Sequence, residues 1–306
     1  MRTRDQQLLN AVQRPDAYDE VVLDSGGVPV VLSVWAGLPD APAVLFLPGT
    51  MTHPLFYEDF LDALNRDGLT VVGLHPQAHG KSPRVRRLLT WDALLRDGRS
   101  TLAWMRERFP SAPLAVLGSS QGGVLAMALA TRDTGLAAVF AHNVLDPSLP
   151  DSIGITRAPA WTGRYHRQVH GLLHLAARVV PGVPVPYWAY LDMRKVTPDR
   201  RIEERLHTDP LGRHTYPLGL LAGMLGEDVT RPVACPVTVI AGSGDPLFPL
   251  PYIRRVFERI NAPVKDLLVV EADRHLILVE ALDQVLPALL PRLHAVAPLT
   301  AATSQA

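Results

Sequence analysis

The chain has little that would tie it to an oxidising compartment or to a charged partner. It has a single cysteine, Cys235, so no internal disulfide can form. Basic and acidic residues number 30 each, and this lack of net charge gives no indication of a nucleic-acid partner or a strongly charged substrate. Lysine is scarce, with three copies in 306 residues, a bias that indicates a GC-rich bacterial genome.

Long apolar runs are also missing. No run reaches the roughly 18 residues that a membrane-spanning helix requires, and residues 1–10 are polar, without the apolar centre of a secretory signal. We therefore expect an unprocessed cytoplasmic protein with a reduced, buried thiol. Hydrophobic residues make up 47% of the chain and charged residues 20%, which excludes disordered and fibrous classes.

Short apolar runs that suit β-strands recur along the chain. Ala43–Leu47 and Leu114–Leu117 are apolar throughout, as expected of strands buried on both faces of a parallel sheet. Helical patterns, with apolar residues three and four apart, follow most of these runs. The alternation predicts an α/β fold, specifically a mostly parallel eight-stranded sheet flanked by helices. The expected strands are 20–23, 28–36, 43–47, 70–74, 114–117, 137–141, 237–241 and 266–270, and the expected helices 57–66, 91–108, 121–131, 251–260 and 276–293.

The alternation stops between Asp146 and Arg231, where Pro, Trp, Tyr, His and Arg are frequent and no buried strand is evident. A structureless loop of this length is rare in a compact domain, so we predict a helical cap inserted after the sixth strand. The expected organisation is a core domain of residues 1–145 and 231–296, a cap or lid of residues 146–230, and a disordered tail of residues 297–306.

The sharpest motif is Gly118-Ser119-Ser120-Gln121-Gly122-Gly123, which follows the apolar run 114–117 and opens a helical pattern. A nucleophile elbow has this order of strand, tight turn and helix, and small residues two places before and after its serine. The serine hydroxyl then lies at a helix N-terminus, which favours a developing negative charge. Ser120 is therefore the candidate nucleophile.

A serine hydroxyl needs a positioned imidazole to take its proton. His275 lies just past the last expected strand and before the last expected helix, on the edge of the sheet where Ser120 is expected. Its place in chain order, after the serine, favours it over the other ten histidines, whose ordinary role is structural.

The imidazole in turn needs a carboxylate to fix its tautomer. Asp245 follows the expected strand 237–241 at the same sheet edge, and the chain order serine, acid, histidine is the one found in α/β hydrolases. Asp146, after the sixth strand, is the rival acid. Asp228 and Asp273 are weaker candidates.

An oxyanion needs two preorganised donors, of which one is the backbone N–H of the residue after the nucleophile, Gln121. The other is expected after the third strand, where Gly49 lets the backbone bend. The Thr50 N–H, or with less support the Met51 N–H, is the second candidate donor.

With these pieces the chain resembles the α/β-hydrolase superfamily over nearly its whole length, and within it the monoacylglycerol lipase, lysophospholipase and serine aminopeptidase group. Pro48-Gly49, His53 and Tyr57 are similar in spacing to that group's His-Gly, Glu-His and Tyr pattern. Residues 75–82 resemble its segment after the fourth strand, and Asp209-Pro210-Leu211 its cap motif.

The chain departs from the group's pattern at four places. Pro48 replaces a histidine, His75 an aspartate and Ala78 a glycine, while Gln121 stands where methionine is frequent. The resemblance implies that these loops line or support the pocket mouth, so the changes are expected to bear on acyl and leaving-group specificity more than on the fold.

The resulting expectation is a serine hydrolase that cleaves a small or medium carboxylic acyl ester, with monoglycerides and lysophospholipids as candidates. Acyl transfer and amide or peptide cleavage use the same groups and stay open, and so does a non-catalytic binder of a hydrophobic ligand. The expected partner is a small molecule, with no nucleic acid and at most transient contact with a lipid surface. Oligomeric state and cap movement are not indicated.

We expect neither a metal nor a cofactor. His166, His170 and His174 recur every four residues, a spacing that can hold zinc or nickel on one helical face, but no carboxylate joins them. His75 and His79 share this spacing in a loop that contains Pro76. A structural role is favoured for both sets.

Overall fold

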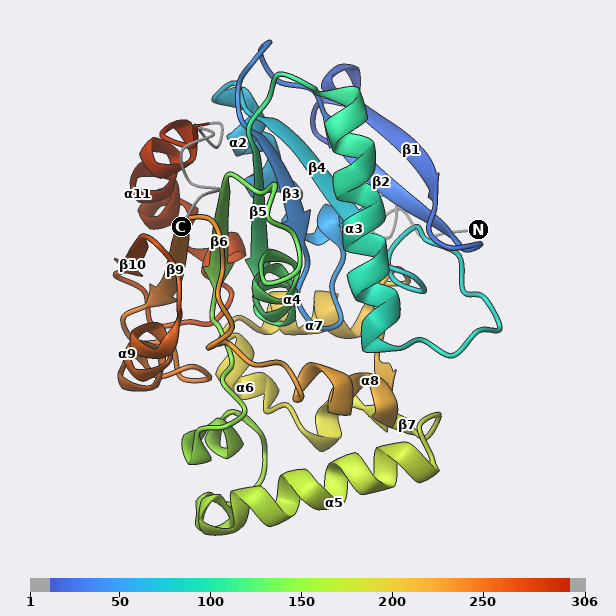
Figure 1. The fold of residues 1–306 in the computed structure, drawn as a ribbon, viewed down its shortest axis with the longest axis vertical. Coiled ribbons are helices and arrows are strands. Elements are labelled where there is room, and N and C mark those ends of the chain that lie inside the picture. Colours follow the sequence, from blue (N-terminus) through green and yellow to red (C-terminus); the bar gives the residue numbers. More distant parts are fainter. Residues whose placement is uncertain (1–11, 298–306) are drawn as a thin grey trace.

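The computed structural model describes residues 12–297 and is built around one eight-stranded sheet in the order β1-β2-β4-β3-β5-β6-β9-β10 (Figure 1). β2 runs antiparallel to both of its neighbours, and all other pairs are parallel. The predicted sheet, with eight mostly parallel strands, is confirmed. The strands are β1 (Tyr18–Asp24), β2 (Pro29–Trp35), β3 (Ala43–Leu47), β4 (Thr70–His75), β5 (Leu114–Ser119), β6 (Ala138–His142), β9 (Val237–Gly242) and β10 (Lys265–Val270).

The central strands are buried along their whole length. Every residue of β3, β4, β5, β6 and β9 is buried, whereas β1 and β10 at the sheet edges alternate or are half-buried. Continuous apolar runs are what a strand covered on both faces requires.

Helices cover the two faces of the sheet. α3 (Trp91–Arg108) and α4 (Gln121–Ala130) contact each other and the central strands, while α2 (Glu58–Arg66) contacts β4, α10 (Ile277–Glu280) and α11 (Leu282–His294). α9 (Leu250–Arg259) packs on β9. Short 3₁₀ helices complete the chain at η1 (Pro15–Ala17), η2 (Pro54–Tyr57), η3 (Pro150–Ile155), η4 (Ala160–Tyr165) and η5 (Tyr187–Ala189).

The single helix expected over residues 276–293 is instead divided in two. Ala281 has a φ of −137°, outside the helical range, so α10 ends before it. Its carbonyl accepts from the N–H groups of Gln284 and Val285, at 3.1 and 3.0 Å, and thereby starts α11. The break turns the chain directly after the loop that carries His275.

The segment between β6 and β9 lies across the end of the sheet at which β5 passes into α4 (Figure 1). It holds four α-helices and, beyond what the sequence indicated, a pair of three-residue antiparallel strands. We call residues 146–230 the inserted segment, and their role as a separate cap stays a prediction. Its elements are α5 (His166–Val179), β7 (Pro184–Pro186), α6 (Met193–Val196), α7 (Arg200–Thr208), β8 (Thr215–Pro217) and α8 (Leu218–Met224).

The inserted segment is tied to the sheet domain by polar contacts. His53 Nε2 and Asp209 Oδ2 lie 2.8 Å apart, and both side chains are almost fully buried. The backbone N–H of Gly80 donates to Leu211 O at 2.9 Å, and that of Arg213 to Met51 O at 3.1 Å. The segment is therefore fixed against the loops that follow β3 and β4.

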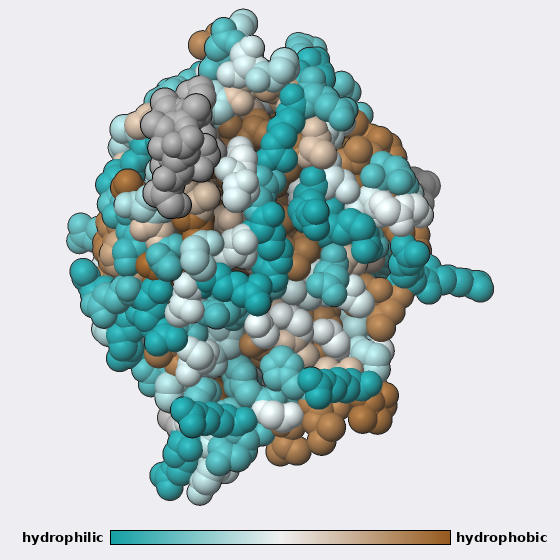
Figure 2. Space-filling view, in the orientation of Figure 1, coloured by the Kyte–Doolittle hydropathy of each residue, from teal (hydrophilic) through white to brown (hydrophobic). Residues whose placement is uncertain are grey.

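Apolar side chains gather at one end of α5, where Figure 2 shows them as a continuous patch. The most exposed are Val179 (72%) and Leu172 (68%), with Leu175, Val180 and Val183 nearby. Within residues 12–297, no helix is both long and apolar enough to cross a membrane. The expectations for residues 1–10 and for the tail beyond Ala297 lie outside the described residues.

Two histidines are buried without charge at the end of β4. His75 Nδ1 accepts from the Lys81 N–H at 3.1 Å, and His79 Nδ1–H donates to Gln77 O at 2.9 Å. Burial, reinforced by neighbouring positive groups, lowers the pKa of His79 to about 3 and that of His75 well below its usual value. The folded protein therefore holds both rings neutral at pH values where the unfolded chain protonates them.

We expect the free energy of unfolding to fall as the pH drops below about 6.5, by about 1.4 kcal/mol per pH unit for each neutral buried histidine. The sign follows because the unfolded state binds the extra protons. Urea denaturation between about pH 7 and pH 5 measures this slope. His79→Gln, which cannot titrate there, should show a shallower slope, and an unchanged slope would contradict the assignment.

Candidate active site

Ser120 lies at the turn between β5 and α4, in a backbone conformation that few residues adopt. Its φ is 54° and its ψ −114°. A Cβ on Gly118 would lie 1.9 Å from Gly122 O, and a Cβ on Gly122 would lie 2.0 Å from Leu47 O. Both positions therefore require glycine, because helix and strand ends approach too closely for any side chain. The tight turn predicted from the motif is present.

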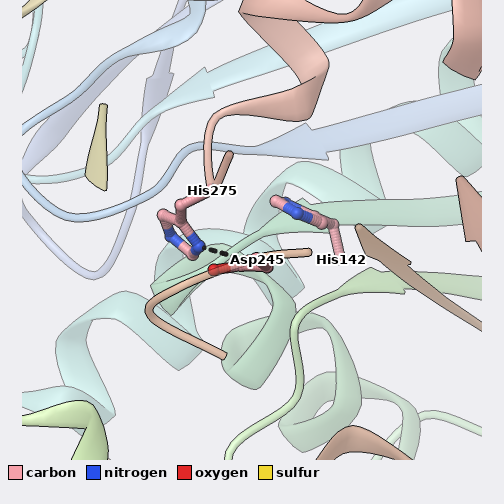
Figure 3. A group of neighbouring side chains, drawn as sticks. All are labelled: His142, Asp245 and His275. Carbon is pink, nitrogen blue, oxygen red and sulfur yellow. Dashed lines mark hydrogen bonds and ion pairs between the residues drawn. The ribbon is translucent and has the colours of Figure 1, made fainter. Parts of the chain in front are cut away.

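The structure brings Ser120, His275 and Asp245 together from three separate loops. His275 Nε2 lies 3.1 Å from Ser120 Oγ, and His275 Nδ1 lies 3.0 Å from Asp245 Oδ2. Figure 3 shows the imidazole and the carboxylate facing each other. With Nδ1–H donating to the carboxylate, Nε2 is left as the acceptor for the serine proton.

Asp245 is held on both of its oxygens. Oδ1 accepts from the N–H groups of Leu247 and Phe248, at 2.8 and 2.9 Å, and Oδ2 faces His275. Burial acts to raise the pKa of Asp245, but the His275 ring and these donors outweigh it and leave the pKa below its usual value. The Phe248 ring also stacks on the imidazole, with 5.5 Å between centroids.

The rival acids are engaged elsewhere. Asp146 accepts from Arg259 Nε at 2.7 Å and from Ser148 Oγ at 2.7 Å. Asp228 accepts from Thr230, and the Asp273 side chain is 80% exposed and pairs with Arg274. Geometry thus favours Asp245 among the acids that the sequence offered.

The two candidate oxyanion segments lie side by side. Gln121 begins α4, so its N–H has no helical carbonyl to bind. The Met51 N–H donates to Tyr216 OH at 2.8 Å, which leaves the Thr50 N–H as the better candidate for the second donor. Thr50 Oγ1 donates to Gln121 Oε1 at 2.9 Å and links the two segments.

A cavity of about 410 Å³ opens beside Ser120, between the sheet domain and the inserted segment. Thr50 and Gln121 also line it, and most of the remaining wall is apolar. Tyr190 contributes a buried hydroxyl that has no partner among the described residues. Other lining residues include Val124, Leu145, Ile153, Arg157, Val169, His170, Leu173, Leu191, Leu221, Met224 and Phe248.

The α5 histidines do share one face, with ring centroids of His166 and His170 5.6 Å apart and those of His170 and His174 6.3 Å apart. Within residues 12–297, however, the atoms able to bind a metal converge only at His142, Asp245 and His275. His142 was not anticipated from the sequence. Neither was Asn143, whose amide nitrogen lies 2.8 Å from Asp245 Oδ2.

The fold and the site can be compared with known proteins. A family model described as serine aminopeptidase, S33, matches residues 39–281. The chain belongs to this family. Its membership confirms the resemblance to the α/β hydrolases of the monoacylglycerol lipase and serine aminopeptidase group. No curated protein matches the sequence.

Solved structures of lipases and of an esterase share the fold at low sequence identity. A monoacylglycerol lipase from Paleococcus ferrophilus has 19% identity and a TM-score of 0.68, over 88% of this chain and 99% of the other. A soluble variant of the Saccharomyces cerevisiae monoglyceride lipase has 15% identity and a TM-score of 0.71, over 94% and 98%. A carboxyl esterase from Bacillus coagulans has 14% identity and a TM-score of 0.69, over 92% and 99%.

Replacing Asp245 by asparagine tests the choice of acid. We expect Asp245→Asn to lower kcat about ten-thousand-fold, because the amide favours the wrong imidazole tautomer. Steady-state hydrolysis of a p-nitrophenyl ester measures the change. Asp146→Asn is the control and should keep kcat, and the assignment fails if the two variants behave the other way round.

Proposed function

We propose that this protein is a serine esterase that hydrolyses the carboxylic ester of an apolar acyl group through an acyl-enzyme on Ser120. The observation that carries the proposal is the continuous contact from Ser120 Oγ to His275 Nε2 and from His275 Nδ1 to Asp245 Oδ2, at 3.1 and 3.0 Å. The fold neighbours named as lipases and an esterase support it.

In the proposed first step, Ser120 Oγ attacks the ester carbonyl carbon while His275 Nε2 takes the hydroxyl proton. Asp245 keeps the imidazole oriented and stabilises its positive charge. The carbon–oxygen bond to the alcohol then breaks, and His275 returns the proton to the departing alkoxide. Water repeats the sequence on the acyl-enzyme, releasing the carboxylic acid and the free serine.

The negative oxygen formed at each attack would be bound by the N–H groups of Gln121 and Thr50. Both belong to a preorganised frame, because Gln121 starts a helix and Thr50 is tied to its side chain at 2.9 Å. Fixed donors need no rearrangement as charge develops, which is why such contacts accelerate acyl transfer strongly.

The lining of the cavity favours an acyl ester over a peptide with a free amino terminus. Among the described residues that line it, none is acidic and Arg157 carries the only fixed charge. A substrate ammonium group would therefore find no carboxylate. An acyl chain suits the apolar wall formed with the inserted segment, which we propose acts as the cap, and the Tyr190 hydroxyl is available to a substrate oxygen.

Medium acyl esters, including monoglycerides and lysophospholipids, are the proposed substrates. Acyl transfer differs only in the second nucleophile, and nothing in the cavity favours an alcohol over water. Contact of the exposed α5 patch with a lipid surface stays a prediction. A non-catalytic binder would not require the aligned serine, imidazole and carboxylate.

The serine mechanism predicts covalent labelling by a fluorophosphonate probe. Ser120 should be phosphonylated in the wild type, because its hydroxyl is activated by His275. Intact-protein mass spectrometry reads out the adduct, and Ser120→Ala is the control that should take none. A folded wild type that neither labels nor hydrolyses p-nitrophenyl esters would refute the proposal.

The cavity predicts a dependence on acyl length that one α5 residue controls. Leu173 lines the cavity, whereas Leu175, two residues later, is 58% exposed. We expect Leu173→Trp to lower kcat/KM for octanoyl esters about tenfold, since a methylene or two of lost space costs 1–3 kcal/mol, and to affect acetyl esters less. Leu175→Trp serves as the matched control. Equal losses at all chain lengths, or equal effects of both variants, would place the acyl chain elsewhere.

A further inference from the structure

Asn143 lies directly behind the candidate acid, at the end of β6. Its side chain is fully buried, and its amide nitrogen is 2.8 Å from Asp245 Oδ2, 2.8 Å from His142 Nε2 and 3.1 Å from His275 Nδ1. Figure 3 shows the three side chains that surround this point. One nitrogen therefore occupies the centre of the group whose atoms would otherwise converge on a metal ion.

The orientation of the amide follows from its neighbours. With the amide reversed, Asn143 Oδ1 would lie where Nδ2 does now, against an ionised carboxylate oxygen, which is repulsive. Nitrogen must therefore face Asp245. His275 donates its own Nδ1 proton to Asp245, so the second amide proton of Asn143 is available to His142 Nε2.

His142 can accept that proton only while it is neutral. Its ring is buried between Ser119, Asn143 and His275, and burial lowers its pKa to about 3. The Nδ1–H then donates to Ser119 Oγ at 3.2 Å, which also receives the Tyr57 hydroxyl proton at 3.3 Å. The amide is thus held by a line of hydrogen bonds that runs through His142 and Ser119 to Tyr57.

The arrangement is retained despite two unfavourable features. Asn143 has a φ of 61°, in the left-handed region that favours glycine. Its Oδ1 is buried and has no partner among the described residues. Glycine at this position would relieve the backbone and leave no orphan oxygen, so packing alone does not require asparagine here. The positive φ and the unpartnered oxygen, both next to Asp245, indicate that the amide N–H of Asn143 has a functional role.

We propose that Asn143 is a positioning residue, whose side-chain amide N–H donates to the Asp245 carboxylate and fixes it so that it holds the His275 imidazole toward Ser120. The inference rests on the proposed esterase function. Asp245 Oδ1 is bound by two backbone N–H groups, and Asn143 supplies the matching donor at Oδ2. The carboxylate consequently has one orientation and shares its charge between imidazole and amide.

Two variants distinguish the contribution of the Asn143 side chain from that of its backbone conformation. Asn143→Gly keeps a left-handed backbone and removes only the side chain, and Asn143→Asp keeps the shape and replaces the donor by a second carboxylate. We expect each to lower kcat about 10- to 100-fold, the scale of a misplaced catalytic group, with KM changed less than about twofold. Asp40→Gly, at an exposed residue with a φ of 62°, is the backbone control and should retain wild-type kinetics.

The pH profile of kcat/KM gives a readout that a purely structural role would not move. Without the amide donor, the Asp245 carboxylate interacts more strongly with the imidazole, so we expect the acid limb of the profile to move to higher pH. Asn143→Asp should move it further than Asn143→Gly. Glu280, which interacts electrostatically with His275 and with Arg274, is the same in all variants.

The outcomes distinguish a failure of the positioning role of Asn143 from a failure of the proposed esterase function. Wild type that fails to label with fluorophosphonate overturns the esterase proposal, and the inference with it. Wild type that labels, with both Asn143 variants matching its kcat and its acid limb, overturns the positioning role alone. A loss of kcat with unchanged pH profile and lowered melting temperature in both variants assigns Asn143 to stability and also overturns the role.

Discussion

The close approach of α4 to the ends of β3 and β5 is the constraint on which the site depends. Gly118 and Gly122 allow helix and strands to meet without side chains between them, and the chain can turn only with Ser120 in the left-handed region. That turn places a hydroxyl and a free N–H at the helix N-terminus together. The orientation of Ser120 is therefore a property of backbone packing rather than of its own contacts.

The buried polar groups near Ser120 fix one another's roles as hydrogen-bond donors and acceptors. In a low-dielectric interior an unmatched donor or acceptor is costly, so each group fixes the protonation of the next. The Asp245 carboxylate determines that the Asn143 amide nitrogen faces it, and His142, which stays neutral because it is buried, accepts the second amide proton. The frame extends from Tyr57 to Asp245 through side chains contributed by four different segments.

Much of the sheet could be predicted because its strands are covered on both faces and read as uninterrupted apolar runs. Ser120, Asp245 and His275 could be proposed from chain order, since parallel strands bring their carboxyl ends to one edge. Asn143 and Tyr216 could not, because their importance lies in contacts with residues far away in sequence. The β7–β8 strand pair and the helix break at Ala281 could not be predicted for a related reason. The structure of such short elements depends on contacts with neighbouring segments rather than on sequence periodicity.

The loop after β3 takes its shape from the inserted segment as much as from the sheet. Tyr216 accepts the Met51 N–H, Arg213 N–H donates to Met51 O, and Asp209 binds His53. Residues 209–216 thus support the loop that carries Thr50, although they are distant from it along the chain. Recombination between related hydrolases would preserve function only if this stretch and the loop were inherited together. The segment as a whole is not an interchangeable module.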